Sequence, residues 1–374
     1  MKILQLGKFY PIKGGVEKVM YDLMIGLSAR EIKCDMLCAT PEKTKTKTLN
    51  PHAKLMCSHA WLQAAGTMIA PSMIFKLMGI KKEYDIIHVH HPDPMACIVL
   101  FLSGYKGKVV LHWHSDIVRQ KTLMRLYRPF QKWLIKRADL IVGTTPIYIR
   151  ESQDLQKVQH KTTYLPIGVD EMLHDPIGAK RLQDIYHNRK IVFSMGRLVH
   201  YKGYSNLVKA AQYLPDDYVV IIGGAGILMP ELRSLTEELG LQDKVQLLGF
   251  VRENEVPSYY TACKLFCLPS VQKTEAFGIV QIEAMSSGKP VVATKIPGSG
   301  VAWVNENGVS GLNVTPGNPQ EIAEAIQAII EDEQTYQKFA EGARKRYETN
   351  FTQEKMIEKA IDIYNGVLKT EKIS

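Results

Sequence analysis

Short apolar runs rich in β-branched residues alternate with helical stretches along the whole chain, and this alternation restricts the possible folds most strongly. The pattern is typical of parallel sheets joined by crossover helices, so we expect an α/β protein. The expected strands of the first half are Lys2–Leu6, Cys34–Ala39, Ile86–Val89, Lys108–Leu111, Leu140–Thr144 and Thr163–Leu165. Those of the second half are Lys190–Met195, Tyr218–Ile222, Val245–Leu248, Leu265–Leu268 and Pro290–Ala293.

The length of 374 residues favours two domains, because it exceeds what one typical core holds. The two sets of strands are separated by Leu165–Asp170, whose proline and glycine suit an ordered turn. We therefore expect one Rossmann-like domain in residues 1–168 and another in residues 169–352. A helical stretch from about Pro319 to Glu348 precedes a last helix within residues 353–374.

The net charge of +9 is unevenly distributed. Residues 1–168 contain 25 Lys and Arg against 12 Asp and Glu, whereas residues 169–374 contain 22 against 26. This asymmetry indicates an anionic partner for the first half, and nucleic acid, a membrane surface or a phosphorylated substrate would each fit. We expect Lys43–Lys47, with three lysines, to be a mobile loop that adds to this charge.

Neither a run of 18 apolar residues nor a signal peptide is found, so we expect a cytosolic protein. The six cysteines show no C-x2-C spacing of a zinc or redox site. Most lie in strand-like runs, and we expect reduced core residues.

Two adjacent glycines, Gly14 and Gly15, stand between the first expected strand and a helical pattern. Their bare backbone N–H groups suit a phosphate or a hydroxyl-rich ligand, although a plain turn would use the same residues. Gly224 and Gly226 follow the strand Tyr218–Ile222, but the third glycine of the dinucleotide fingerprint is missing. NAD is therefore not expected.

His114 and Asp116 follow the expected strand Lys108–Leu111, at the edge where open α/β sheets bind ligands. The segment His88–Asp93 places further histidines at another strand end. Imidazole and carboxylate are zinc ligands, but the spacing fits no defined zinc pattern. We interpret these histidines as hydrogen-bonding walls of a pocket and expect no metal.

Arg197 and Lys202 follow the strand Lys190–Met195, with Gly196 and Gly203 beside them. A guanidinium offers a fork of donors that matches phosphate oxygens, and an ammonium adds a mobile charge. Five residues apart, both can reach one diphosphate. The alternative is a pair of solvated basic side chains.

Glu275 and Glu283 flank the expected start of a helix near Phe277. Glu275 then lies in the preceding loop and Glu283 on the second turn, so both can face one ligand at a helix N-terminus, which favours anions. Gly278 permits a close backbone approach. Two solvated glutamates are the alternative.

A basic amphipathic segment spans residues 117–137. It contains Arg119, Lys121, Arg125, Arg128, Lys132, Lys136 and Arg137 without an acidic residue. The apolar residues at helical spacing are Leu123, Leu126, Tyr127, Phe130, Trp133 and Leu134, with Pro129 as a kink or helix start. Such a helix binds an anionic membrane or packs its apolar face on the sheet beneath a solvated basic face. Both interpretations stay open, and they can hold together.

These motifs, in this order from Gly14 and Glu17 to the last helix, resemble those of retaining glycosyltransferases of family 4. The resemblance implies the GT-B fold, in which two Rossmann-like domains with parallel sheets face a central cleft and the last helix crosses back onto the first domain. It implies no cofactor, and the sequence contains no D-x-D motif of metal-dependent transferases.

The same resemblance implies roles for individual residues. Glu275 and His114 would contact the transferred sugar, and Arg197 and Lys202 the diphosphate. The implied donor-binding residues are Gly14, Gly15, Gly196, Gly224, Phe277, Gly278 and Glu283, and the implied acceptor-side residues are Glu17 and Asp116, which can also orient His114.

The opening motifs are most similar to mannosyl- and rhamnosyl-type members that build O-antigen or capsule. This similarity implies GDP-mannose as donor, followed by a UDP-hexose, and a lipid-linked or polysaccharide acceptor. The enzyme would then work at the inner face of the cytoplasmic membrane. The alternatives are a GT-B nucleotide-sugar epimerase or phosphorylase and, from another class, a basic nucleic-acid-binding protein, for which no recognised motif is present.

Overall fold

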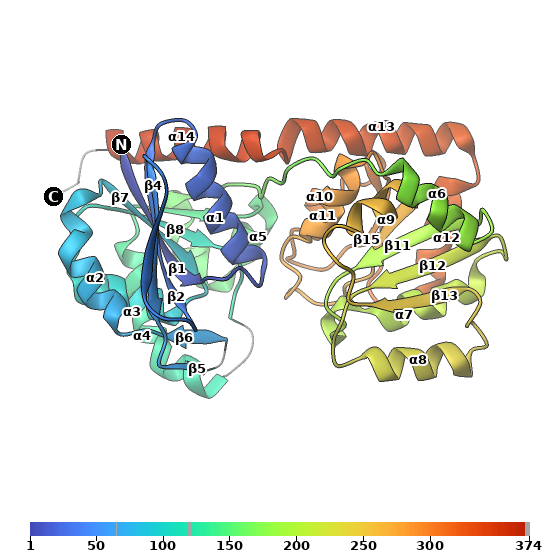
Figure 1. The fold of residues 1–374 in the computed structure, drawn as a ribbon, viewed down its shortest axis with the longest axis horizontal. Coiled ribbons are helices and arrows are strands. Elements are labelled where there is room, and N and C mark those ends of the chain that lie inside the picture. The colour runs from blue at the N-terminus through green and yellow to red at the C-terminus, as the bar shows by residue number, and fades with distance from the viewer. Residues whose placement is uncertain (65, 118–120, 371–374) are drawn as a thin grey trace. The chain divides into compact units, whose positions relative to one another are not determined.

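The computed structural model describes residues 1–64, 66–117 and 121–370, with the backbone alone for residues 121–124. The chain divides into two compact units. Unit 1 comprises Met1–Gly168 and Gln353–Ser374, and unit 2 comprises Val169–Thr352. Both units are α/β structures with helices on both faces of a sheet (Figure 1), as the alternating pattern predicts.

The main sheet of unit 1 has eight strands in the order β10-β9-β8-β7-β1-β2-β4-β3. Neighbouring strands run parallel except β3 and β4. Their bounds are β1 Lys2–Phe9, β2 Lys33–Thr40, β3 Lys45–Asn50, β4 Ala53–His59, β7 Ile86–His91, β8 Lys108–Trp113, β9 Leu140–Gly143 and β10 Thr162–Tyr164. A separate two-stranded sheet pairs β5 Leu62–Ala64 with β6 Thr67–Ile69.

The prediction of a mobile loop at Lys43–Lys47 is wrong, because β3 begins at Lys45. This strand is exposed on both faces for most of its length, so it lacks the apolar alternation that marks a half-buried strand. The strand is held in place by its backbone pairing with β4, which the pattern of its side chains does not indicate.

The helices of unit 1 cover both faces of the eight-stranded sheet (Figure 1). They are α1 Gly15–Ser28, α2 Ser72–Ile80, α3 Pro94–Ser103, α4 Lys121–Arg137, α5 Pro146–Glu151 and α14 Gln353–Lys369, with short 3-10 helices at η1 Lys81–Glu83 and η2 Gln153–Lys161. The last helix, α14, packs against α1 although more than 300 residues separate them in the chain.

Unit 2 contains six parallel strands in the order β13-β12-β11-β14-β15-β16. Their bounds are β11 Lys190–Met195, β12 Tyr218–Gly223, β13 Val245–Gly249, β14 Leu265–Leu268, β15 Val291–Thr294 and β16 Gly311–Val314. The helices are α6 Pro176–Ile185, α7 Tyr204–Ala210, α8 Met229–Glu238, α9 Val256–Ala262, α10 Ile279–Ser286, α11 Val301–Val304, α12 Pro319–Ile330 and α13 Glu333–Asn350, with η3 His200–Lys202 and η4 Ala211–Tyr213.

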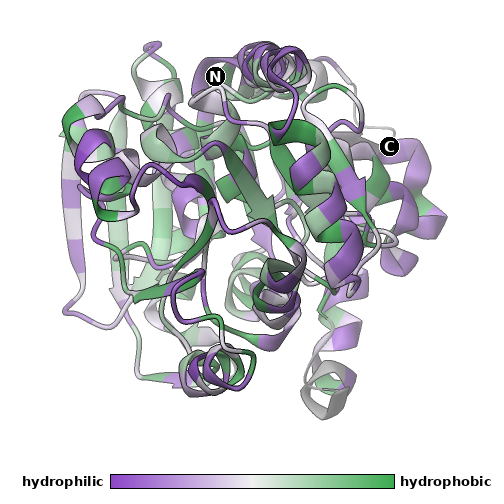
Figure 2. Ribbon diagram, turned by 90° about the vertical axis from the view of Figure 1, so that its right-hand side faces the viewer, coloured by the Kyte–Doolittle hydropathy of each residue, from purple (hydrophilic) through white to green (hydrophobic). Residues whose placement is uncertain are grey.

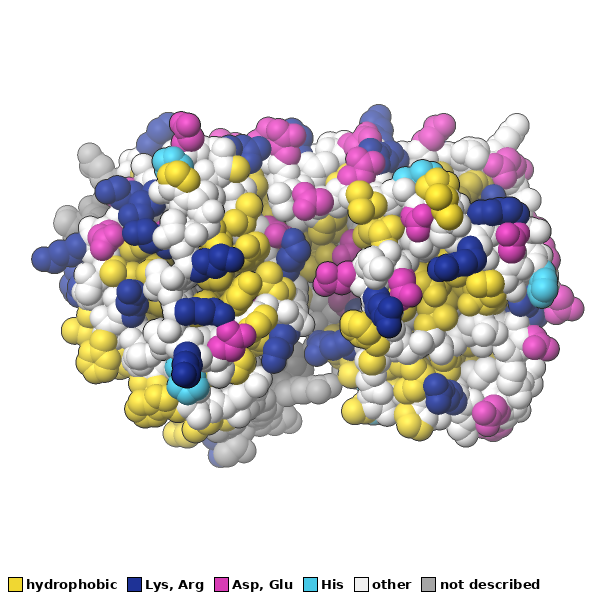
Figure 3. Space-filling view, viewed as in Figure 1, with side chains coloured by type: hydrophobic (Ala, Val, Ile, Leu, Met, Phe, Trp, Pro, Cys, Tyr) yellow, Lys and Arg dark blue, Asp and Glu magenta, His cyan; other side chains and the backbone are white. Residues whose placement is uncertain are grey.

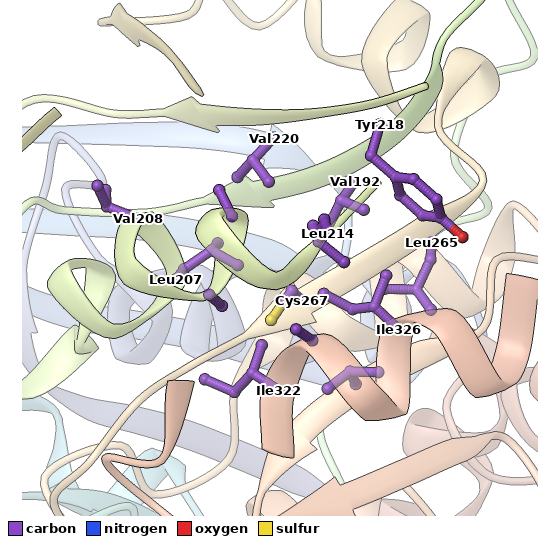
Figure 4. Packing of buried hydrophobic residues seen from close by; sticks show 14 of the residues in the cluster. Val192, Leu207, Val208, Leu214, Tyr218, Val220, Leu265, Cys267, Ile322 and Ile326 are labelled. Atoms are coloured by element: carbon purple, nitrogen blue, oxygen red, sulfur yellow. The ribbon is translucent and has the colours of Figure 1, made fainter. Parts of the chain in front are cut away.

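The core of unit 2 lies between the sheet and the helices α7 and α12. Val192, Val220 and Leu265 of three adjacent strands face Leu207 of α7 and Ile322 of α12 (Figure 4). In Figure 2 the strands are largely green, whereas the outer helices alternate green and purple. A sheet buried on both faces reads as continuous apolar runs, and this explains why the sequence marks these strands well.

The helical stretch predicted from about Pro319 to Glu348 is two helices rather than one. α12 ends at Ile330, and the side chain of Asp332 accepts a hydrogen bond from the Thr335 backbone N–H (2.7 Å) as N-cap of α13. An aspartate within an apolar periodic pattern starts a new helix here because it satisfies a free donor of the first turn.

Helix α4 packs one of its faces against the rest of unit 1. Tyr127 and Leu134 are buried, and the rings of Phe130 and Trp133 lie edge-on to Phe101 of α3 with centroids 5.6 and 4.9 Å apart. The apolar face that the sequence predicts is therefore used, at least in part, for packing inside the protein.

Other parts of the basic segment depart from this picture. Leu126 is 76% exposed, so it does not belong to the packed face, and Pro129 lies inside α4 rather than at its start. Arg119 lies outside the described residues, as do the side chains of Lys121 and Leu123. Among the helices that are described, none has both the length and the apolar character to cross a bilayer.

The packing of α14 on α1 yields a stability prediction. A Cβ on Gly26 of α1 would lie 2.5 Å from Cγ1 of Ile357 in α14, so Gly26→Ala should destabilise by about 1–3 kcal/mol through overpacking. Helix propensity alone predicts the opposite sign, a gain of about 1 kcal/mol. Denaturant melts would measure the difference.

The matched control is Gly366→Ala in α14, where an added Cβ meets nothing within 4 Å. This variant should be unchanged or more stable by up to about 1 kcal/mol. An equal increase in the free energy of unfolding of both variants would show that α1 and α14 do not pack as described.

Candidate active site

The sheet of unit 2 reverses its strand order between β11 and β14. From β11 the chain proceeds outward to β12 and β13 on one side, and from β14 to β15 and β16 on the other. Open α/β sheets bind ligands outside the carboxyl ends of the strands at such a switch point. The loops that follow β11 and β14 there are 196–203 and 269–278.

Glycines let these loops approach closely. Gly203 has a φ of +68°, and a Cβ there would lie 2.2 Å from the Pro269 carbonyl oxygen. Gly224, with a φ of +139°, is in similar contact with the Gly196 carbonyl oxygen, which a Cβ would approach to 1.8 Å. Side chains at either position would separate the loops, so these glycines hold the site together.

A buried ion pair joins the two loops. Lys202 Nζ lies 2.7 Å from Glu275 Oε2, and the two side chains are only 10% and 11% exposed. Ser270 Oγ donates a hydrogen bond of 3.0 Å to the same carboxylate oxygen. The sequence places Lys202 and Glu275 in one site but does not predict that they pair with each other.

Arg197 is the accessible cation of this region. Its side chain is exposed, and Nη2 donates to the hydroxyl of Tyr201 (3.2 Å). A Cβ on Gly196 would lie 3.2 Å from Lys202 Nζ, so Gly196 and Lys202 are direct neighbours. One exposed guanidinium and one buried ammonium thus follow the same strand, and the mobile charge that the sequence predicts for Lys202 is instead held in an ion pair.

The loop after β14 leads into α10 through Gly278, whose φ is +76°. Phe277 is 4% exposed and lies edge-on to Phe351, so its side chain belongs to the core and only its backbone can meet a ligand. Glu283 lies on the second turn, as predicted, and accepts a hydrogen bond of 2.9 Å from the hydroxyl of Tyr260. Burial and the nearby Glu283 raise the pKa of Tyr260, so this hydroxyl stays a donor.

Unit 1 also reverses its strand order, between β1 and β7. After β1 the chain reaches Gly14, the N-cap of α1, and Gly15, its first residue. Glu17 is 5% exposed, and its Oε2 would lie 2.9 Å from a Cβ on Gly14. Burial raises the pKa of Glu17, while the charge of Lys8 opposes this shift.

His114 directly follows β8 and is 4% exposed. Its Nε2 lies 2.9 Å from Nδ1 of His90, and its ring stacks on His112 with centroids 3.8 Å apart. Burial, together with His112 and Lys8, holds the pKa of His114 well below its usual value. The ring is therefore neutral at neutral pH, able to exchange hydrogen bonds but not to act as a cation.

Asp116 accepts hydrogen bonds at Oδ1 from Trp113 Nε1 (2.8 Å) and Ser152 Oγ (2.7 Å). The hydrogen-bond partner that the structure gives His114 is His90. The orienting role that the sequence offers to Asp116 therefore falls to a histidine on the neighbouring strand.

Nitrogens of His88, His90 and His112 lie within 4.8 Å of one another, and all three residues are buried. Both ring nitrogens of His90 are already hydrogen-bonded, to His114 and to Gln5. A metal ion bound by these three residues would have to break one of those bonds. His88 and His90 therefore belong to a hydrogen-bonded network, whereas both ring nitrogens of His112 have no hydrogen-bond partner among the described residues.

Several residues of these regions carried no signal in the motifs. Tyr260 and Ser270 meet the two glutamates only because β14 and α9 fold beside them. Gln5 is different, since a fully buried glutamine between Leu4 and Leu6 in an apolar strand is a sign of a polar partner inside.

Comparisons with known proteins agree with this architecture. A family model described as glycosyl transferases group 1 matches residues 179–346, and one described as glycosyltransferase family 4 matches residues 13–172. The O-antigen chain mannosyltransferase C of Escherichia coli is 30% identical over 99% of this chain and all of its own. The D-rhamnosyltransferase WbpZ of Pseudomonas aeruginosa is 29% identical over 94% of this chain and 92% of its own.

Among solved structures, that of HepE from Anabaena in complex with UDP is similar, with a TM-score of 0.78. It is 24% identical and covers 98% of this chain and all of its own, so it bears on the fold alone. The matches span both units and nearly every residue, and they show that the chain belongs to the family 4 glycosyltransferases of the GT-B fold.

Proposed function

We propose that this glycosyltransferase moves a hexose from a nucleotide sugar to a growing surface glycan, with retention of anomeric configuration and without a metal ion. The observation that carries this proposal is the buried pair of Lys202 and Glu275 at the switch point of unit 2, with Arg197 exposed nearby. A site that holds one carboxylate and two cations suits a ligand with a diphosphate at one end and hydroxyls at the other.

Charge accounts for the proposed catalysis. As the glycosidic bond breaks, negative charge grows on the leaving diphosphate, and cations already in place stabilise the transition state more than the ground state. Arg197 would meet the phosphates first because it is exposed. Lys202 would then exchange Glu275 for a phosphate oxygen, which frees the carboxylate to accept hydrogen bonds from the sugar.

The remaining predicted residues have matching tasks in this proposal. Glu283 would accept hydrogen bonds from the ribose hydroxyls, and Gly278 would offer its backbone N–H. In unit 1, Gly14, Gly15 and His114 would line the sugar, while Glu17 and Asp116 would lie toward the acceptor. The departing phosphate would take the proton of the attacking hydroxyl, as front-face retention requires.

The proposed sugar donor and glycan acceptor follow from the activities of the relatives. The mannosyltransferase among the relatives supports a mannose donor. We propose GDP-mannose first and a UDP-hexose next. O-antigen chains grow on a lipid carrier, so we propose a lipid-linked acceptor at the inner face of the cytoplasmic membrane.

A membrane-facing surface of unit 1 is consistent with such an acceptor. Helix α3 packs against α2 and α4, and these helices expose Phe75 (74%), Leu102 (50%) and Leu126 (76%). Arg125 and Arg128 of α4 are also exposed. On the face of unit 1 seen in Figure 3, Lys and Arg side chains lie among hydrophobic ones. Exposed apolar residues within a basic field fit an anionic interface, at about 1 kcal/mol per basic residue.

Nucleotide binding gives the first test. One nucleoside diphosphate, GDP in the first instance, should stabilise the protein by about 2.7 kcal/mol at 100 times its dissociation constant. Glu283→Ala should abolish this gain, whereas Glu324→Ala, on the exposed side of α12, should keep it. Thermal-shift assays with GDP, UDP and ADP would measure the effect, and no gain with any of them would contradict the proposed donor site.

The ion pair gives a second test that separates structure from catalysis. Lys202→Met should cost about 3–5 kcal/mol of stability, because it leaves a buried carboxylate unpaired. The double variant with Glu275→Gln should recover most of that stability, yet both variants should transfer sugar at least about 100-fold more slowly.

Denaturant melts and initial-rate assays would provide the two readouts. Lys180→Met is the control, since its ion pair with Asp184 is 69% and 59% exposed and should be worth under about 1 kcal/mol. Recovery of turnover together with stability in the double variant would mean that the pair is purely structural.

Membrane binding gives a third test. Replacing Arg125, Arg128 and Lys132 by glutamine should weaken binding to anionic vesicles about 100-fold, from about 1 kcal/mol per charge. Lys209, Arg233 and Lys338, three exposed residues of unit 2, provide the matched control triple. Equal, negligible co-sedimentation of the wild type with anionic and neutral vesicles would refute the membrane surface.

A further inference from the structure

A continuous chain of hydrogen bonds runs through the buried face of the unit 1 sheet. His114 Nε2 pairs with His90 Nδ1 (2.9 Å), and His90 Nε2 pairs with Oε1 of Gln5 (2.7 Å). Nε2 of Gln5 contacts the hydroxyl of Tyr364 (3.3 Å), which in turn contacts His88 Nδ1 (2.7 Å). Except for His114, all these side chains are 0% or 1% exposed, so water does not compete for these bonds.

The two faces of the Gln5 amide have different partners, and this fixes its orientation. The NH2 group has two hydrogens to place, and two acceptors face it, the Tyr364 hydroxyl and Cys34 Sγ at 3.5 Å. In the flipped orientation the NH2 group would meet His90 alone, and one hydrogen would be buried without an acceptor. In the observed orientation both hydrogens have an acceptor.

The protonation states of the neighbouring side chains agree with this orientation of the Gln5 amide. Burial raises the pKa of Tyr364 and lowers that of His88, so the tyrosine hydroxyl can donate to an unprotonated His88 Nδ1. Burial also raises the pKa of the Cys34 thiol to about 12, which leaves its sulfur neutral. Every donor from His114 to Tyr364 then has one acceptor, whereas the protonated Nε2 of His88 is buried without a hydrogen-bond partner among the described residues.

The direction of the chain decides which nitrogen of each histidine carries the proton. Oε1 of Gln5 can only accept, so His90 must carry its proton on Nε2 and keep a lone pair on Nδ1. His114 must then donate from Nε2. We infer that Gln5, held by Tyr364 of the C-terminal helix, is a positioning residue that fixes His114 in the Nε2–H tautomer and leaves its Nδ1 as a hydrogen-bond acceptor.

This inference rests on the proposed function in one respect, namely that His114 contacts the transferred sugar. With the proton on Nε2, His114 accepts a hydrogen bond from a sugar hydroxyl. In the other tautomer it would present an N–H and donate a hydrogen bond to the hydroxyl oxygen instead. Among the described residues no hydrogen bond to Nδ1 is found, so this nitrogen is available to a ligand.

Imidazole nitrogen NMR tests the assignment directly. In ¹⁵N-histidine-labelled full-length protein, with His114 assigned by its loss in His114→Gln, Nδ1 should resonate as an unprotonated nitrogen and Nε2 as a protonated one. Gln5→Leu should move both resonances toward a mixture of tautomers. Its kcat should fall roughly 10- to 100-fold, the range for residues that orient a functional histidine.

Two variants serve as controls. Gln5→Glu keeps an acceptor for His90 Nε2 and should retain the tautomer and most of the turnover lost in Gln5→Leu. Cys34→Ala removes the other contact of the Gln5 amide, which is the weaker one, and should leave both readouts near wild type.

Each outcome decides one point. A proton on Nδ1 of His114 in the wild type, or unchanged resonances in Gln5→Leu, would overturn the inference, and the wild-type spectrum suffices if Gln5→Leu does not fold. Wild-type turnover of His114→Gln, with the expected tautomer present, would uphold the positioning role of Gln5 and refute the sugar contact of His114.

Discussion

The site in unit 2 depends on how closely two loops can approach at one edge of a parallel sheet. Gly203 lies so close to the Pro269 carbonyl that no side chain would fit between the two loops. Because the loops meet, an ammonium from one and a carboxylate from the other are buried together. Neither charge alone would be stable there, since an unpaired buried ion costs several kcal/mol. The paired state therefore keeps an ammonium and a carboxylate buried together in this site.

Unit 1 differs from unit 2 in the position of its polar groups. They lie on the face of the sheet rather than beyond its edge. Strands buried on both faces are normally apolar. Alternate residues of β7 and β8 are instead histidines, His88 and His90 on β7 and His112 on β8, and His114 directly follows β8. Burial keeps them neutral, and His88, His90 and His114 make hydrogen bonds without a charge to neutralise, whereas the ring nitrogens of His112 have no partner among the described residues. The hydroxyl that completes this network comes from α14, which ties the last helix of the chain to the first strand.

Much of the fold could be predicted from the sequence, and the exceptions have physical causes. Every strand expected from an apolar run is present, since a doubly covered parallel strand has a strong signal. β3 was missed because Lys45–Asn50 has no buried face, and β5, β6 and β16 because they are short. β4 was also missed, although most of Ala53–His59 is buried. The break before α13 follows from a single cap, Asp332, which periodicity does not reveal.

For the candidate site, motif spacing could identify which residues belong near a ligand but not their partners. Lys202 and Glu275 are 73 residues apart in the chain, and their contact requires the strand order β11-β14, which the sequence does not encode locally. The same holds for Glu283 and Tyr260, and for His114 and His90. Hydrogen-bond partners across strands are set by register, and register emerges only when the sheet is assembled.

The edge strand β3, which was not predicted from the sequence, has a further consequence. β3 ends the large sheet of unit 1, where a row of unpaired backbone groups would invite a strand of another molecule. Lys45 and Lys47 are exposed on this outermost strand. A second copy approaching edge to edge would have to bring like charges together, so these lysines protect the protein against aggregation at high concentration.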